Sequence, residues 1–381
     1  MKIIDNQPDI NRRTLGVTFS TDYQAKAVLW APLAKQVALA INDQVTNLPL
    51  TNDDSGYWHL ETDQLKPGDT YTFVLDDEKV CADPASLAQP QGVYGPSQAV
   101  DTNKFYWEDS CWINPPLDDY SLYELDVRTF SPEGTYAAVV RQLGQLKKRG
   151  INALLIKSDS SVAASPDELF LYATQASHGG PYQLQHLVNA CHYEGIAVIL
   201  DINYTEISKQ NAYLKFHRAN KQKATQREST FTNDSHRGAG RRYVIENALM
   251  WFRDFHIDAL RLNAVYTLPD SEQILTEIRA YTDQLTDQTG THYCLLVEHE
   301  LVNKSFTDNT ATHNIPPNNE LLSVSTNENS SSFCTDSQPG KLPVKTYRED
   351  CMYDDYFSSA LRGLFGRQTQ PGHAGELLRS F

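Results

Sequence analysis

Hydrophobic and polar residues alternate over short distances in the first quarter of the chain. Between residues 14 and 76, runs rich in β-branched and aromatic residues are separated by turn sequences such as Asp-Asp-Ser-Gly and Lys-Pro-Gly-Asp. Short strands without intervening helices are typical of a small β-sandwich. The aromatic residues Trp30 and Trp58 could stack on sugar rings, but filling of the sandwich core is the favoured interpretation. The predicted strands are residues 15–19, 25–30, 36–41, 56–61 and 71–75.

A different pattern begins near residue 120, where apolar runs alternate with segments of helical period. Gly150 and Gly195 are helix stops that precede two of the apolar runs. Repeated strand–helix units indicate a parallel sheet and, over several repeats, a (β/α) barrel. The predicted strands are residues 121–130, 151–157, 196–204, 257–262 and 293–297, and the predicted helices are residues 136–149, 182–194, 247–255 and 271–284.

The strand–helix rhythm is interrupted over residues 303–345, where Asn, Ser, Thr and Pro dominate and a long loop is expected. A sixth strand is predicted at residues 348–353 and its helix at residues 357–365. An eightfold barrel needs two more units, so we expect either irregular closure or an open sheet edge that pairs with another chain. The predicted fold class is α/β, with an N-terminal Ig-like β-sandwich followed by an incomplete (β/α) TIM-type barrel.

A segment rich in proline and glycine, residues 81–107, separates the two patterns. This composition predicts an ordered, irregular connector rather than a helix or a strand. We therefore expect two domains, a β-sandwich with its connector over residues 1–110 and a barrel over residues 111–381.

Composition narrows the classes of partner. The 381 residues are 40% hydrophobic and 21% charged, which is typical of globular proteins. A net charge of −15 argues against nucleic acid, because no basic surface would offset the phosphate charge. The first residues lack the apolar core of a signal peptide, and no apolar run is long enough for a membrane span, so a soluble cytoplasmic protein is expected. The six cysteines form no C-x-x-C motif, and neither a metal nor a cofactor is expected.

Polar residues directly follow two of the predicted barrel strands. Asn263 ends the fourth strand, in the sequence Arg261-Leu262-Asn263-Ala264, and Glu298 ends the fifth. Barrel enzymes hold their catalytic groups at such strand ends. We therefore expect the chemistry of the barrel, if it has any, to depend on these positions.

Several longer motifs resemble the malto-oligosyltrehalose trehalohydrolases, a branch of the α-amylase superfamily. They are Asp83-Pro84-Ala85-Ser86, Tyr123-Glu124-Leu125, His178-Gly179-Gly180-Pro181 and Ile199-Leu200-Asp201. The resemblance implies an early-set sandwich joined to an α-amylase barrel that hydrolyses α-glucosidic bonds. This branch of the superfamily releases trehalose from trehalose-capped maltooligosaccharides.

In this family, two carboxyl groups flank the bond that is cleaved. The resemblance places Glu298 at the position of the acid that protonates the leaving oxygen. It places Asn263 at the position of the nucleophile, where the family has Arg-x-Asp. An amide is a poor nucleophile toward carbon and carries no charge to stabilise an oxocarbenium ion. The family's third carboxylate, in an Asn-His-Asp motif, has no counterpart in the sequence.

The substrate-binding positions implied by the resemblance are only partly retained. The family segments Tyr-Asn-His and Trp-Gly-Tyr-Asp read Tyr204-Thr205-Glu206 and Ala164-Ser165-Pro166-Asp167 in this chain. Tyr204, Glu206, Asp167 and Asp201 remain as candidate substrate-binding residues. A structural role is favoured for Asp201 and Arg261, which are expected to pair and hold two strand ends together.

The sequence therefore predicts a catalytically degenerate glycoside hydrolase homologue that retains α-glucan binding or a regulatory role. The alternative is an active hydrolase that releases trehalose with a substitute carboxylate. Glu206 is the better substitute, because Asp258 starts its strand and is expected at the other end of the barrel. A third interpretation is a pure carbohydrate-binding module. The expected partners are an α-glucan or maltooligosaccharide and, at the open barrel edge, a second copy of the chain.

Overall fold

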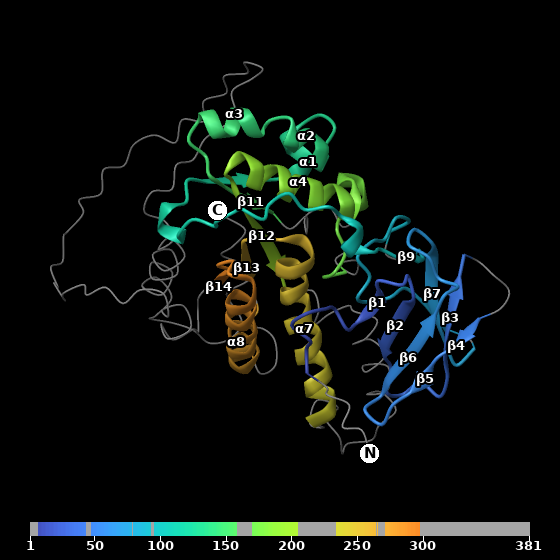
Figure 1. Ribbon diagram of the computed structural model, residues 1–381. Coiled ribbons are helices and arrows are strands. Elements are labelled where there is room, and N and C mark those ends of the chain that lie inside the picture. Colours follow the sequence, from blue (N-terminus) through green and yellow to red (C-terminus); the bar gives the residue numbers. More distant parts are fainter. Residues whose placement is uncertain are drawn as a thin grey trace, which may run out of the picture.

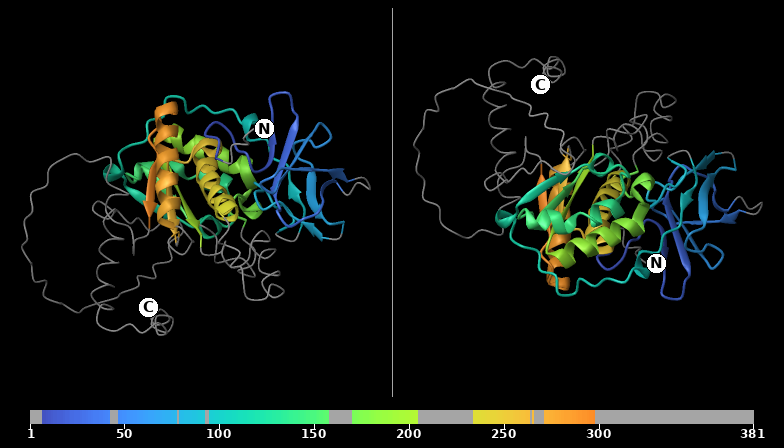
Figure 2. Two further views of the ribbon diagram at one scale, coloured as in Figure 1. Left: turned by 90° about the horizontal axis from the view of Figure 1, so that it is seen from below. Right: turned by 90° about the horizontal axis from the view of Figure 1, so that it is seen from above.

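The structure is a computed structural model, and two units are visible in it, a β-sandwich and an α/β unit (Figure 1). Figure 2 shows the sandwich, in blue, to one side of the α/β unit, in green to orange. In the long helix at residues 234–255, side chains are described from residue 238 onward. The structure describes residues 7–42, 47–77, 79–92, 95–157, 170–204, 234–263, 265 and 271–297.

The sandwich consists of two antiparallel sheets with the strand orders β1-β2-β6-β5 and β4-β3-β7-β8, and β9 also pairs with β7. All five predicted strands are present, whereas four short strands were not predicted from the sequence. These short strands have two or three residues each, which is too few for an alternating pattern to show. The strands are β1 (Gly16–Phe19), β2 (Ala25–Trp30), β3 (Val37–Ile41), β4 (Leu48–Pro49), β5 (Thr51–Asn52), β6 (Tyr57–Thr62), β7 (Thr70–Leu75), β8 (Lys79–Cys81) and β9 (Ser97–Gln98).

The two tryptophans of the sandwich are both buried, but only Trp58 fills the sandwich core as predicted. Trp58 packs in the core between the two sheets, and its indole donates a hydrogen bond to the carbonyl of Ala31 at 2.9 Å. Trp30 belongs instead to the larger apolar cluster that continues into the α/β unit. One aromatic residue therefore stabilises the sandwich and the other its junction with the second unit.

The α/β unit is built on a parallel sheet of five described strands in the order β10-β11-β12-β13-β14. One face of the sheet packs against the helices in the main apolar cluster, and the other face carries a second cluster of small and branched residues around Tyr120. Both faces are thus covered, as a parallel sheet requires. The strands are β10 (Leu122–Leu125), β11 (Ala153–Ile156), β12 (Ala197–Asn203), β13 (Ala259–Asn263) and β14 (Cys294–Val297), and the helices are α1 (Val127–Phe130), α2 (Tyr136–Val140), α3 (Leu143–Lys148), α4 (Gly180–Glu194), α7 (Asp234–Phe255) and α8 (Ser271–Thr289).

Two predictions for the α/β unit are wrong in detail. The first barrel strand ends at Leu125, because the side chain of Asp126 accepts hydrogen bonds from the backbone N–H groups of Arg128 and Thr129 and starts helix α1. The single helix predicted over residues 136–149 is divided into α2 and α3. The sixth strand and helix predicted at 348–353 and 357–365, and the loop at 303–345, lie outside the described residues.

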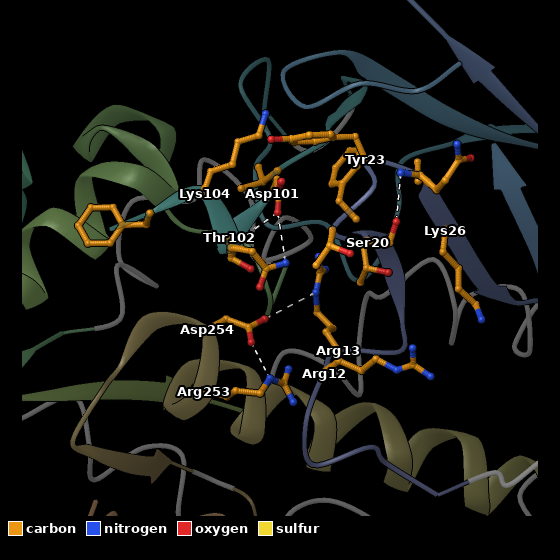
Figure 3. A pocket seen from close by; sticks show the side chains of 18 of the residues that line it. Arg12, Arg13, Ser20, Tyr23, Lys26, Asp101, Thr102, Lys104, Arg253 and Asp254 are labelled. Carbon is orange, nitrogen blue, oxygen red and sulfur yellow. Dashed lines mark hydrogen bonds and ion pairs between the residues drawn. The ribbon is translucent and has the colours of Figure 1, made fainter. Parts of the chain in front are cut away.

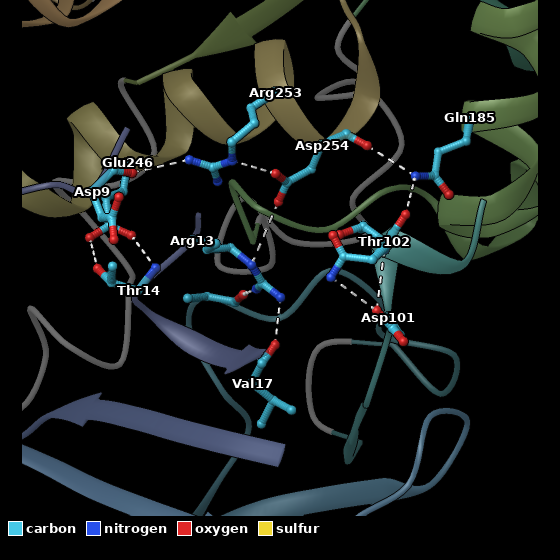
Figure 4. A network of polar contacts seen from close by, with 12 residues as sticks. Asp9, Arg13, Thr14, Val17, Asp101, Thr102, Gln185, Glu246, Arg253 and Asp254 are labelled. Carbon is cyan, nitrogen blue, oxygen red and sulfur yellow. Dashed lines mark hydrogen bonds and ion pairs between the residues drawn. The ribbon is translucent and has the colours of Figure 1, made fainter. Parts of the chain in front are cut away.

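Polar side chains join the sandwich to the α/β unit (Figure 4). Arg13, which precedes β1, is buried and donates hydrogen bonds to the carbonyls of Ala85 and Val17. Gln185 on α4 donates to the carbonyls of Thr102 at 3.2 Å and Asp254 at 2.9 Å. These contacts fix the connector between the two units, which agrees with the prediction that it is ordered although irregular.

A second polar cluster fixes the N-terminal end of the parallel sheet. The ring of His192 lies between two carboxylates, with Nδ1 2.8 Å from Asp109 and Nε2 2.9 Å from Asp258. Asp258 also accepts a hydrogen bond from the indole of Trp112 at 2.6 Å, and Asp109 contacts His256 at 2.8 Å. Asp258 is 1% exposed, so the cluster is a buried support and not a reactive site. Its place at the start of the strand confirms the prediction from the sequence.

The cluster predicts a pH dependence of stability. Burial acts to lower the pKa of His192, but hydrogen bonds to Asp109 and Asp258 raise it to about 9. A raised pKa contributes stability that is complete below the unfolded value of about 6.5 and is lost as the pH rises through about 9. The shift corresponds to as much as about 3 kcal/mol of unfolding free energy. Urea denaturation at about pH 6.5 and 9.5 should show this decline.

The matched variant is His192→Gln, which cannot gain a proton. Its unfolding free energy should be lower than that of the wild type near pH 6.5, and the difference should shrink toward pH 9.5. An identical pH slope in the variant and the wild type would contradict the assignment to His192.

Candidate functional site

Three polar side chains meet at the C-terminal ends of two neighbouring strands. Parallel pairing places Asp201 of β12 beside Arg261 of β13, and Asn203 beside Asn263. Side chains two residues apart on a strand point to the same face, so Arg261 and Asn263 share a face. This end of a parallel barrel is where catalytic residues are held.

The carboxylate of Asp201 is the centre of this group. Arg261 donates two hydrogen bonds to it, from Nε to Oδ1 at 3.1 Å and from Nη2 to Oδ2 at 3.0 Å. The amide nitrogen of Asn263 donates a third, to Oδ1. Asp201 is 8% exposed, and a buried carboxylate needs such donors. The pairing of Arg261 with Asp201 predicted from the sequence is therefore present.

Asn263 takes part in this group as a hydrogen-bond donor. Its side chain is half-buried, and its amide nitrogen faces the carboxylate of Asp201. An uncharged amide in this geometry has neither the negative charge nor the nucleophilicity that attack on an anomeric carbon requires. The described group therefore contains one carboxylate, and an arginine already neutralises that carboxylate.

Tyr204 lies directly after β12 and is fully buried. Its backbone N–H donates to the carbonyl of Asn263 at 3.0 Å, and its hydroxyl donates to the side chain of Asn247 at 3.1 Å. Asn247 in turn donates to the carbonyl of Leu171 at 2.9 Å. Burial raises the pKa of Tyr204 above its ordinary value. In the described structure Tyr204 thus links the strand end to helix α7, and a contact with substrate stays a prediction.

The other candidates from the sequence, Glu298, Glu206 and Asp167, lie outside the described residues. The last described residue before Glu298 is Val297, which pairs with Leu262 next to Asn263. The structure therefore brings together Asp201, Arg261, Asn263 and the backbone of Tyr204.

A small hollow of about 80 Å³ opens beside Asp201. Its lining includes Lys157, Asn203 and His178, which were not selected from the sequence as site residues. Lys157 directly follows β11 and pairs with Glu124 at 3.0 Å. Position alone could have identified Lys157 and Asn203, because both stand at the C-terminal end of a predicted strand.

In the described part of the chain, no group of three or more His, Cys, Asp or Glu side chains is arranged to hold a metal ion. None of the helices in the same residues combines the length and apolarity needed to cross a membrane.

Comparisons with known proteins agree with the geometry. Residues 14–88 match carbohydrate-binding module 48, the isoamylase N-terminal domain. Malto-oligosyltrehalose trehalohydrolases are 32% identical over 75% of this chain in Arthrobacter ramosus and 36% identical over 71% in Deinococcus radiodurans. These alignments cover 52% and 45% of the two relatives, so the chain spans about half the length of the curated relatives it matches.

Solved structures show the same fold. A candidate alpha amylase from Salmonella typhimurium superposes with a TM-score of 0.62 at 26% identity, over 75% of this chain and 50% of that one. A pullulanase from Paenibacillus barengoltzii gives a TM-score of 0.55 at 20% identity, over 71% of this chain and 51% of that one. The N-terminal sandwich and the start of an amylase-like (β/α) barrel, both predicted from the sequence, are therefore confirmed.

The hydrogen bond from Asn263 to Asp201 can be tested through stability. Asn263→Asp removes the donor and places a second carboxylate against the first. We expect the unfolding free energy at pH 7 to fall by about 1–3 kcal/mol. Two carboxylates that share a site raise one pKa, so the loss should shrink as the pH falls toward about 4. Urea denaturation at the two pH values measures both effects.

Asn263→Ala is the matched control, since it removes the donor without adding charge. Its loss of stability should stay nearly constant between the two pH values. If Asn263→Asp and Asn263→Ala respond identically to pH, the side chain at position 263 does not contact Asp201.

Proposed function

Because the chain belongs to the α-amylase superfamily, we propose that it is an α-glucan-binding homologue of the malto-oligosyltrehalose trehalohydrolases that does not hydrolyse its ligand. The observation that carries this proposal is the amide of Asn263, hydrogen-bonded to Asp201 at the position where the superfamily has its nucleophile. The following considerations support it.

Retaining hydrolysis requires a carboxylate nucleophile and a carboxylic acid roughly 5 Å apart. Asn263 supplies no anion, and Asp201 is held by Arg261 in a bidentate ion pair at 3.0 Å. A carboxylate that accepts three hydrogen bonds has its lone pairs directed at those donors and is a weak nucleophile. Loss of a nucleophile typically lowers the rate by roughly 10⁴ to 10⁶.

Binding makes smaller demands than cleavage. The frame of Arg261, Asp201 and Tyr204 is intact, and residues 14–88 match a carbohydrate-binding module. Among the structural relatives, the pullulanase from Paenibacillus barengoltzii was solved in complex with maltohexaose and alpha-cyclodextrin. We therefore infer that the ligand class of this chain is an α-glucan or maltooligosaccharide.

The second candidate function is an active hydrolase that releases trehalose from maltooligosyl trehalose with a substitute carboxylate. One observation favours this candidate. Strand β12 ends at Asn203, and Glu206 follows it in the sequence by three residues. Asp258 is not a substitute, because it is buried and contacts His192 and Trp112 at the opposite end of the sheet.

The third interpretation, a pure carbohydrate-binding module in which residues 1–115 alone retain binding, has less support. Trp30 and Trp58 are 6% exposed each, so neither offers an open ring to a sugar. Residues of the sandwich, the connector and the α/β unit also share one apolar cluster. We propose that the chain is organised as two domains that meet at residue 110. Because they share an apolar cluster, we expect each to depend on the other for stability.

Calorimetry and product analysis on the purified full chain distinguish these candidates. Maltooligosaccharides and their trehalose-capped forms should bind without release of trehalose or glucose. Release that Glu298→Gln abolishes would overturn the proposal, whereas release that Glu206→Gln abolishes would establish the second candidate. Absence of binding to either ligand would also refute the proposed function.

The variant Asn263→Asp provides a matched gain-of-function control in the same assay. If the missing anion is what prevents hydrolysis, this variant should release product at least about 100-fold faster than the wild type, which is a part of the full nucleophile effect. The double variant Asn263→Asp with Glu298→Gln should lose that gain.

Self-association through the sheet edge stays a prediction. Among the described strands, β10 pairs only with β11 and β14 only with β13, and exposed edges pair with other chains. We expect a dimer or larger assembly in light scattering at micromolar concentration. A monomer at all concentrations would contradict this prediction without affecting the proposal for glucan binding.

A further inference from the structure

A large cavity in the described part of the chain lies between the two units, away from the strand ends described above. Its volume is about 980 Å³, and it is lined by the β1–β2 turn, the connector and the end of helix α7 (Figure 3). His256 lines it and precedes β13, whose opposite end carries Asn263. The cavity is thus a separate place on the molecule, at the N-terminal end of the barrel strands.

The cavity is positively charged in an acidic protein. Five cationic side chains line it, against three carboxylates, although the whole chain carries a net charge of −15. Clustering of one charge sign in a cleft concentrates ligands of the other sign. The cations are Arg12, Arg13, Lys26, Lys104 and Arg253, and the carboxylates are Glu61, Asp101 and Asp254.

The carboxylates are largely engaged within the protein. Asp254 contacts Nε of Arg253 at 2.6 Å and Nε of Arg13 at 4.0 Å. Glu61 pairs with Lys26 at 3.6 Å. Asp101 accepts the backbone N–H of Asn103 at 3.2 Å as a helix cap. The ion pairs neutralise both partners, so the excess positive charge of the lining comes from the cations that outnumber the carboxylates.

Four of the five cations form ion pairs with carboxylates, and Lys104 is the exception among the described residues. Lys104 is exposed and takes part in none of the ion pairs between described residues. Nη2 of Arg253, which also lines the cavity, is buried and has no hydrogen-bond acceptor among the described residues. Lys104 therefore brings to the cavity a positive charge that no described carboxylate neutralises, and such a charge favours an anionic ligand.

An aromatic ring completes the opening. Tyr23 is 54% exposed, and Nζ of Lys104 lies 5.1 Å from the centre of its ring. Tyr23 has a φ of +57°, in the left-handed region that a bulky residue rarely adopts. Backbone strain of this kind persists where the surroundings impose it and is concentrated at binding sites.

We propose that this cavity binds a phosphorylated sugar. Its phosphate would lie near Lys104, Arg253 and Arg12, and its hydroxyl groups would meet the polar side chains of Gln24 and Asn103. The volume falls within the range of small-molecule sites, roughly 300–1,000 Å³. A neutral glucan fits less well, because it gains nothing from the excess of cations.

The aromatic faces also favour the anion. Lys104 lies over one face of Tyr23, and His256 stacks on one face of Trp107 with ring centres 3.7 Å apart. Glucan sites depend on open aromatic faces on which sugar rings stack.

The ligand would touch both the sandwich and the α/β unit, so binding should stabilise the junction between them.

The test is calorimetric titration of the full chain at low ionic strength with glucose 6-phosphate, inorganic phosphate, glucose and maltotriose. We expect saturable binding of glucose 6-phosphate, weaker binding of inorganic phosphate, and no binding of the two uncharged sugars at this site. Lys104→Glu should weaken the binding of glucose 6-phosphate by at least about tenfold, since it reverses a charge next to the phosphate.

Lys148→Glu is the matched control, because this exposed lysine on α3 does not line the cavity. It should change the affinity less than about twofold. Tyr23→Ala offers a second variant at the opening, and thermal unfolding confirms that each variant is folded.

Several outcomes would overturn the proposal. They are no saturable binding of glucose 6-phosphate, equal effects of Lys104→Glu and Lys148→Glu, or binding of inorganic phosphate as tight as that of the sugar phosphate. Binding of maltotriose that Tyr23→Ala removes would assign the cavity to a neutral glucan instead. Maltotriose binding that Tyr23→Ala leaves unchanged would report the site at Asn263 instead, so the outcome for glucose 6-phosphate does not depend on the proposed function.

Discussion

The C-terminal end of the sheet depends on the burial of one carboxylate. Asp201 belongs to a strand whose first six residues are buried, and removing its charge from water is unfavourable unless donors replace the water. Arg261 and Asn263 supply three such donors. The amide of Asn263, at the position where the superfamily has its nucleophile, therefore satisfies the carboxylate beside it. The support of Asp201 and the proposed lack of hydrolysis both depend on position 263.

Much of this fold follows from local patterns, and the exceptions have identifiable causes. The buried strands of the α/β unit are continuous apolar runs, so their existence could be predicted within two or three residues. The end of the first strand could not, because a cap at Asp126 overrides the apolar pattern that continues beyond it. The pairing of Arg261 with Asp201 was predictable only from the family resemblance, since the two residues are sixty positions apart.

The polar cluster at the opposite end of the sheet was not predictable. His192, Asp109 and Asp258 lie on three segments far apart in the sequence, and each alone has the appearance of an ordinary surface residue. The expected position of Asp258 was right because strand direction fixes it. The structural role of Tyr204, which links the strand end to helix α7, was likewise not predictable from the sequence. Its hydroxyl is buried and donates to Asn247, which is distant in the sequence.

The residues at the two ends of strand β13 thus make different contacts. At its C-terminal end, Arg261 and Asn263 serve a buried carboxylate and face the site that the superfamily uses for cleavage. At its N-terminal end, the strand is preceded by His256, which lines the charged cavity, and by Asp258, which contacts His192. A ligand in that cavity contacts groups that hold the sandwich to the sheet and none that hold Asp201. Ligand binding between the units and the chemistry at the strand end of Asn263 would therefore depend on separate side chains.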